Sequence, residues 1–137
     1  MLDTNVIVAA MRSPTGASAE LLRMARRSRL TLLANVALVL EYEATCQLAE
    51  HRLAAGLDQG QVVIFLDAIV AMAEPVETHF MWRPQLRDPS DELVLEAAVN
   101  GQAAAIVTFN RRDFAVAPAK FGIDVLLPVE ALRRITS

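Results

Sequence analysis

The chain has 137 residues and a net charge of -3, from 13 Lys and Arg against 16 Asp and Glu. This length suits one domain over residues 1–137 and argues against a two-domain enzyme with separate cofactor and substrate halves. The acidic balance argues against a basic coat that binds nucleic acid over the whole surface, and the hydrophobic fraction of 54% excludes an intrinsically disordered chain.

Hydrophobic patterning predicts short strands that alternate with helices. The first half of the chain is predicted to hold the end of a buried strand running into a turn at 1–8, a helix from Ser13 and Pro14 to the arginines at 26–29, and a strand at 30–34. Helices at 36–55 and 58–73 follow, and then a strand at 76–80 and a loop at 83–87. The second half is predicted to hold a helix from Asp88 to Gly101, a strand at 104–108, a loop with one helical turn at 110–121, a strand at 123–127 and a helix at 128–135. This alternation favours a parallel sheet with helices on both faces. We therefore expect an α/β fold, a three-layer α/β/α sandwich around a central parallel sheet of four to five strands.

The single cysteine and the short apolar runs favour a cytoplasmic location. Cys46 is the only cysteine and cannot form an internal disulfide. The most apolar runs, 30–40 and 62–73, are shorter than the roughly 20 residues that cross a bilayer, and no secretory leader opens the sequence. We expect a cytoplasmic protein with no membrane partner.

Four acidic residues fall near the expected carboxyl edge of the sheet, where reacting groups gather in open parallel sheets. They are Asp3 at the end of the first strand, Glu41 in the helix after the second strand, Asp91 in the first turn of a helix, and Asp113 after the strand at 104–108. Carboxylates within about 4 Å repel each other by roughly 4 kcal/mol at an effective dielectric near 20, and a hard divalent cation removes that cost. No Cys/His cluster offers zinc its usual ligands. The pattern therefore points to Mg²⁺ or Mn²⁺ and phosphate chemistry.

Each acidic residue also has a plain structural explanation. Asp91 can act as a capping-box carboxylate, Asp3 and Asp113 can close local turns, and Glu41 can lie on a solvated helix face. Arg111 and Arg112 lie in the loop at the same edge and are candidates for phosphate contacts. Only the ordered set favours a functional site over these local roles.

The motifs that carry a family resemblance are Asp3-Thr4-Asn5-Val6, Glu41-Tyr42, Asp88-Pro89-Ser90-Asp91 and Val107-Thr108-Phe109-Asn110 with Asp113-Phe114. In this order they resemble the PIN domain over nearly the whole chain, and their spacing is similar to the small bacterial VapC-like toxins of toxin-antitoxin pairs. The resemblance implies a Mg²⁺- or Mn²⁺-dependent endoribonuclease that hydrolyses RNA phosphodiester bonds. It also implies a protein antitoxin as partner and self-association as a dimer.

The resemblance also assigns roles to these residues. Asp3 and Asp91 would bind metal directly or through water, Glu41 would hold water or act as a base, and Asp113 would complete a weaker metal position. The residues that would orient these carboxylates or contact phosphate are Thr4, Asn5, Thr108, Asn110, Arg111 and Arg112.

The sequence departs from the family pattern at two points. Similar chains carry several more apolar residues before the first Asp, so we expect a first strand cut short by a shortened chain or a misassigned start codon. Many place an Asp where Asn110 stands, and Glu43 competes with Glu41, which matches the family's Glu-Tyr position. Two alternatives follow: a degenerate PIN module that binds RNA or a protein without cutting, and a PIN nuclease of RNA processing. The RNA target, the number of metal ions and the oligomer stay open.

Overall fold

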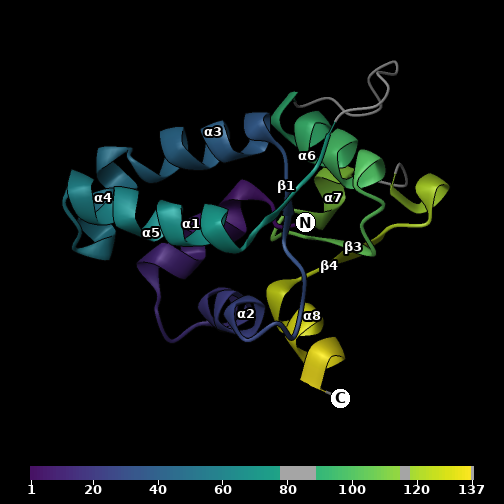
Figure 1. Cartoon of the computed structure of the whole chain (residues 1–137), viewed down its shortest axis with the longest axis horizontal. Helices are drawn as coiled ribbons and strands as arrows, with labels where there is room; N and C mark the ends of the chain where they lie inside the picture. The colour runs from purple at the N-terminus through teal and green to yellow at the C-terminus, as the bar shows by residue number, and fades with distance from the viewer. Residues whose placement is uncertain (78–88, 115–117, 137) are drawn as a thin grey trace.

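The structure is a computed structural model that describes residues 1–77, 89–114 and 118–136. Figure 1 shows the elements, which in chain order are α1 (Thr4–Arg12), α2 (Ala17–Arg26), β1 (Leu33–Ala34), α3 (Val36–Cys46), α4 (Ala49–Ala55), α5 (Gln59–Met72), β2 (Glu74–Pro75), α6 (Pro89–Asn100), β3 (Ala105–Val107), α7 (Arg111–Phe114), a 3-10 turn (Pro118–Phe121), β4 (Asp124–Leu126) and α8 (Pro128–Thr136). The α/β class is as predicted, with helices dominant. The predicted cap Asp88, the loop 83–87 and positions 78–80 of the predicted strand lie outside the described residues.

The strands pair in parallel, but the expected sheet of four to five strands is wrong. Within the described residues, β1 pairs with β2, β3 pairs with β4, and the two ladders are separate. A single parallel bridge, Leu2 to Val107, adds the N-terminal residues to the β3 side. Residues 1–3 are too few to join the ladders, because β pairing needs consecutive residues on both edges. The result is two narrow ribbons rather than one continuous sheet.

The first helix replaces the strand and turn predicted at 1–8. α1 begins at Thr4, where the Asp3 carboxylate accepts a 2.8 Å hydrogen bond from the Thr4 N–H, and the Val6 N–H bonds to the Asp3 carbonyl. Its apolar residues are buried on nearly every side, including Val6, Ile7 and Val8. A helix that is apolar all round lacks a 3.6-residue stripe, so its sequence is hard to distinguish from a buried strand.

Several other helix boundaries differ or agree for identifiable reasons. The predicted helix 36–55 is two helices, α3 and α4, which are separated by Gln47 and Leu48. Neither residue is Gly or Pro, so the sequence gives no sign of this break. Gly56 ends α4 in the left-handed region at φ 72°, as predicted. The predicted start at Asp58 is confirmed, since Asp58 and Gln61 form a capping box at the head of α5.

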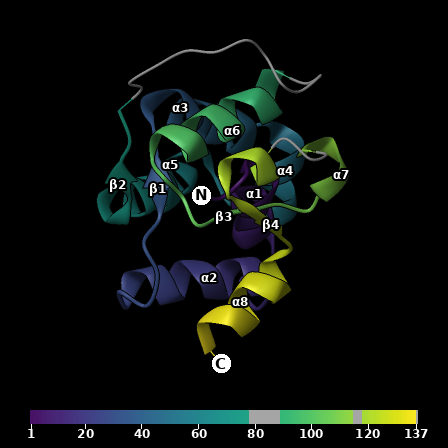
Figure 2. The ribbon, with the colours of Figure 1, turned by 90° about the vertical axis from the view of Figure 1, so that its right-hand side faces the viewer.

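The helices form layers on either side of the strands. α3 and α6 lie on one side of the ribbons and α2 and α8 lie on the other, in both views (Figures 1 and 2). α1 occupies the centre and packs against α2, α3 and α4. The core includes Ile7, Leu38, Leu95, Ile106 and Phe114. Among the described residues, no single helix is long and apolar enough to cross a membrane. α4 and α5 together have the required length and hydropathy, but they are bent by 88° relative to each other.

Candidate active site

Asp3 stands at the junction between the N-terminal residues and α1. Its backbone N–H bonds to the Val107 carbonyl at 2.9 Å, which places it at the carboxyl end of β3. The side chain is 6% exposed, and its second oxygen accepts a 2.7 Å hydrogen bond from the Thr108 hydroxyl. Residues 3 and 108, far apart in sequence, therefore form the centre of the site.

Thr108 links this carboxylate to the loop that follows β3. Its hydroxyl oxygen accepts a 3.0 Å hydrogen bond from the Asn110 N–H and a 3.5 Å bond from the Asn5 amide. The Asn5 side-chain oxygen accepts in turn from the Phe109 N–H at 3.4 Å. Thr108 is fully buried, so these bonds fix its hydroxyl toward Asp3. The four predicted positioning residues Thr4, Asn5, Thr108 and Asn110 thus lie around one carboxylate.

Glu41 reaches the site from α3 through Thr4. The Thr4 hydroxyl donates a 3.0 Å hydrogen bond to the Glu41 carboxylate. The next residue, Tyr42, donates its phenol O–H to the Leu2 carbonyl and so ties α3 to the N-terminal segment. Glu43 is exposed, on a different face of the same helix. The contacts favour Glu41 over Glu43 as the helical acid.

Asp113 and Asp91 come from the two helices on the far side of the site. Asp113 lies in α7, immediately before the fully buried Phe114, and its charge acts on Asp3. Asp91 lies in the first turn of α6 and is 7% exposed. α6 packs against both α3 and α7, the helices that carry Glu41 and Asp113.

The surroundings of Asp3 oppose its ionisation. Burial is the largest effect and raises the pKa of Asp3, while the hydrogen bonds from Thr108 and from the Thr4 N–H lower it. The negative charges of Glu41 and Asp113 raise it again. A cation near these three carboxylates would favour the ionised form of Asp3.

The donor set suits a hard divalent cation. All the candidates are carboxylates or hydroxyl and amide oxygens, which Mg²⁺ prefers. Within the ranges that the structure describes, no three Asp, Glu, His or Cys side chains come close enough to hold one ion together.

Two arginines and one aromatic residue are exposed just after β3 in the chain. Arg111 and Arg112 are both exposed in α7, and Arg111 forms a 3.0 Å ion pair with Glu130. Phe109 is 49% exposed beside Thr108, and its ring was not singled out from the sequence. The position of Phe109 directly after Thr108, at the end of a predicted strand, is only a weak indication from the sequence that its ring would be exposed.

The described residues form an α/β domain in which Asp3 lies at the carboxyl end of β3. The family model described as the PIN domain matches residues 1–112, and the chain belongs to the PIN domain family. PIN domains are nuclease domains that act on nucleic acid and generally use divalent metal ions. No curated protein and no solved structure matches the chain.

Proposed function

We propose that this PIN domain is a Mg²⁺- or Mn²⁺-dependent endoribonuclease. The observation that carries the proposal is the buried Asp3 carboxylate, which Thr108 orients and whose pKa is raised mainly by burial and, to a smaller extent, by the charges of Glu41 and Asp113. A divalent cation would offset the cost of ionising this buried carboxylate, and phosphate substrates arrive with metal ions. Asp91 is proposed as a further ligand from its buried place at the start of α6.

The residues around Asp3 would each perform a defined part of phosphodiester hydrolysis. Asp3 and Asp91 would hold the ion, directly or through water, and Asp113 would support a second, weaker position. Thr108 holds the Asp3 carboxylate in place, and Thr4 does the same for Glu41. A bound divalent ion supplies charge neutralisation at the phosphate and acidifies water.

Glu41 is proposed to accept the proton of the attacking water. The water oxygen forms a bond to phosphorus, the bond from phosphorus to the leaving ribose oxygen breaks, and the leaving oxygen takes a proton from solvent. Arg112 is proposed to contact a flanking phosphate, because it is exposed in α7 and precedes Asp113, while Arg111 is paired with Glu130.

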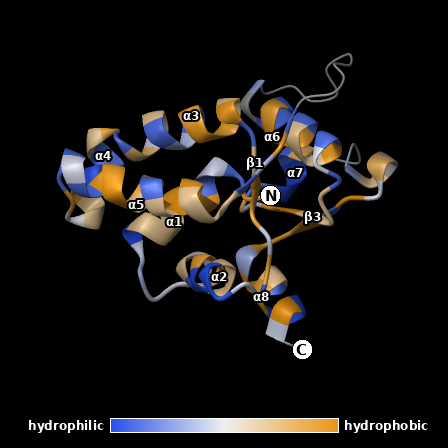
Figure 3. Cartoon of the chain, viewed as in Figure 1, coloured by the Kyte–Doolittle hydropathy of each residue, from blue (hydrophilic) through white to orange (hydrophobic). Residues whose placement is uncertain are grey.

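We propose a toxin role and a protein antitoxin on the VapC-like resemblance alone. The segment from α3 to α5, which carries hydrophobic residues along much of its length (Figure 3), exposes Val36, Leu40, Leu48, Leu53, Val63, Ile64 and Val70. Exposed apolar residues on neighbouring helices mark interaction surfaces. We propose that this apolar face supports a homodimer, and light scattering of Ile64→Glu against the unaltered chain tests it. The dimer should dissociate in the variant, and an unchanged mass excludes this face.

Cleavage of single-stranded RNA with Mn²⁺, and its loss with EDTA, tests the proposed activity. Glu41→Gln should lower cleavage by about 100-fold or more if Glu41 is the general base. Glu43→Gln is the matched control, because it changes the same residue type two positions on, in the same helix, and at an exposed side chain. Equal activity of the two variants would remove Glu41 from the mechanism.

The same assay separates the alternatives. A chain that binds RNA without cutting in any divalent ion is the degenerate module. A chain that cuts only one structured precursor fits RNA processing instead. Growth arrest on expression, relieved by the product of a neighbouring gene, would identify a toxin.

A further inference from the structure

Phe109 is an exposed aromatic residue one position from the centre of the site. Its side chain is 49% exposed, whereas the preceding Thr108 is fully buried and donates a 2.7 Å hydrogen bond to the Asp3 carboxylate. Consecutive Cα atoms lie about 3.8 Å apart, so the Phe109 side chain begins one residue from the group that orients Asp3. A nucleotide next to a phosphate bound at Asp3 would therefore lie within reach of this ring.

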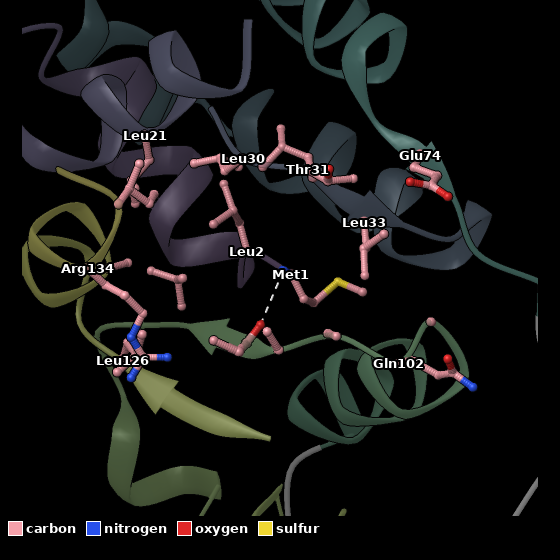
Figure 4. A pocket seen from close by; sticks show the side chains of 18 residues that line it. Met1, Leu2, Leu21, Leu30, Thr31, Leu33, Glu74, Gln102, Leu126 and Arg134 are labelled. Atoms are coloured by element: carbon pink, nitrogen blue, oxygen red, sulfur yellow. Dashed lines mark hydrogen bonds between the residues drawn. The ribbon is translucent and has the colours of Figure 1, made fainter. Parts of the chain in front are cut away.

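The hydrogen bonds of the site hold the backbone of Phe109. The Asn5 side chain spans two consecutive residues: its amide donates to the Thr108 hydroxyl at 3.5 Å, and its oxygen accepts from the Phe109 N–H at 3.4 Å. The Thr108 N–H donates a 2.9 Å hydrogen bond to the Leu126 carbonyl of β4. In the close view of the cavity beside Met1, β3 lies between the N-terminal residues and β4 (Figure 4). Phe109 thus follows a strand end that is bonded on both sides.

Phe109 also begins a short exposed segment that is anchored at both ends. Residues 109–113 are exposed, while the flanking Thr108 and Phe114 are fully buried. A ring on an anchored segment loses little conformational entropy when a ligand covers it. A ligand that covers the ring would also remove from water the apolar surface that Phe109 exposes in the free protein.

Two cations follow the ring in the chain. Arg111 and Arg112 are exposed in α7, within three positions of Phe109, and Arg111 also pairs with Glu130. Proteins that bind single-stranded nucleic acid combine aromatic rings, on which bases stack, with cations that neutralise the phosphate backbone. A single exposed Phe needs no functional explanation, but a Phe between the Asp3 carboxylate and two arginines fits this description.

We propose that Phe109 is a stacking platform for an unpaired base next to the scissile phosphate, a role that rests on the proposed RNA substrate. The ring would make the domain select single-stranded over double-stranded RNA. Phe109 would thus determine which RNA binds, while the acidic residues around Asp3 would determine whether it is cut.

The chemistry of stacking explains why such a ring selects unpaired bases. A base inside a duplex is paired and stacked on its neighbours, so it can cover the Phe109 ring only after it leaves the helix, at a cost in free energy. An unpaired base carries no such cost. Every base has a π face, so the ring would select unpaired RNA without selecting a particular base.

RNA binding without cleavage tests the proposal. All chains in the test carry Asp3→Asn, which should keep the RNA intact in Mg²⁺, and a gel verifies that it is intact. The probe is a fluorescein-labelled RNA of about eight uridines, within the site sizes of single-strand binders, and fluorescence anisotropy gives its Kd. Phe109→Leu keeps an apolar side chain but removes the π face, so the Kd should rise by about tenfold. The same RNA annealed to its complement should bind both chains equally.

Two further variants separate stacking from a change in the segment. Phe109→Trp should bind the single strand at least as tightly as the chain with Phe109, because a larger ring stacks as well. Phe121→Leu is the matched control, since Phe121 is 42% exposed and lies in the 3-10 turn before β4, and it should leave the Kd unchanged. A Trp variant that binds as weakly as Phe109→Leu, or an equal loss in Phe121→Leu, would overturn the proposal.

The outcomes also separate the platform from the proposed activity. A tenfold loss in Phe109→Leu, with no cleavage by the chain that retains Asp3, would support the platform and contradict the ribonuclease. Equal Kd values for Phe109 and Phe109→Leu, with metal-dependent cleavage by the chain that retains Asp3, would overturn the platform alone. A chain that binds the duplex as tightly as the single strand would overturn the selection of unpaired RNA.

Discussion

At the residue scale, Asp3 serves both structure and chemistry. It caps α1 through the Thr4 N–H, and it presents a buried carboxylate to Thr108 and to the charges of Glu41 and Asp113. The cap stabilises the fold, whereas burial of its ionised form destabilises it. A residue that costs stability while holding the centre of a polar network fits a site kept for function.

Replacing Asp3 with Asn separates these two roles. Asn caps helices as well as Asp does, but it has no charge to bury. Because the pKa of Asp3 is raised in the folded state, the folded protein binds more protons at this site than the unfolded chain does. This contribution to stability is present below the ordinary Asp pKa and is lost as the pH rises through the raised one. Asp3→Asn should therefore have a higher Tm than the unaltered chain at neutral pH without metal.

Thermal unfolding across pH checks this expectation. The Tm difference should shrink below about pH 4, where Asp3 is protonated in both states. Added Mg²⁺ should raise the Tm of the unaltered chain and not that of Asp3→Asn. A lower Tm for Asp3→Asn at neutral pH would show that the carboxylate stabilises the fold by itself.

Thr108→Val tests the orientation of Asp3. The change keeps the shape of a fully buried side chain but removes the hydroxyl that donates to Asp3 and accepts from Asn110. Metal affinity or cleavage should fall by about 10- to 100-fold, as for other groups that orient a ligand. Thr45→Val, a half-buried Thr in α3, is the control and should keep full activity. Undiminished metal binding in Thr108→Val would mean that the hydroxyl does not position Asp3.

The sequence could predict these residues but only part of how they meet. Strand ends placed Asp3 and Thr108 at one edge, and the structure joins them directly. The bond from Thr4 to Glu41 depends on a helix that starts at Thr4, and the apolar run at 6–11 gave this helix the appearance of a buried strand. The ion pair that engages Arg111 joins residues 19 positions apart and needs tertiary structure to be seen.

At the element scale, helices are more predictable than strands. α5 and α8 carry local start signals, Asp58 and Pro128, and both start where these predict. β1 and β3 are two and three residues long, shorter than the apolar runs at 30–34 and 104–108 that predicted them. β2, at Glu74–Pro75, lies just before the strand predicted at 76–80. Strand length depends on a partner in the correct register, and that partner is distant in sequence.

The capping box of α5 gives a test at this scale. Asp58→Ala removes the side chain that accepts from the Gln61 N–H at 2.8 Å, and it should lower the free energy of unfolding by about 1 kcal/mol. Asp67→Ala, at an exposed position in the middle of the same helix, is the control. Urea denaturation measures both. Equal midpoints for the two variants would show that α5 does not need its cap.

At the scale of the whole molecule, α1 and the inner face of α3 make one core. Leu38, Tyr42 and Cys46 are spaced four residues apart on one face of α3 and are all buried in this core. Burial raises the pKa of Cys46 to about 11. The thiol therefore reports on the integrity of the core.

Cys46 in the folded chain should react with a disulfide reagent at neutral pH more than about 100-fold slower than in concentrated guanidinium. The rate should rise toward pH 11, because the thiolate fraction rises. Absorbance at stopped-flow resolution measures both rates. Rapid stoichiometric labelling of the folded chain would show that α3 is not packed as described.

The central claim is that the carboxylates around Asp3 form a metal-dependent ribonuclease site. The most direct measurement is cleavage of single-stranded RNA in Mn²⁺ by the unaltered chain and by Asp3→Asn, with folding of both verified by thermal unfolding. We expect cleavage by the unaltered chain, loss of cleavage with EDTA, and a fall of about 100-fold or more in folded Asp3→Asn. Cleavage that survives both EDTA and Asp3→Asn would contradict it.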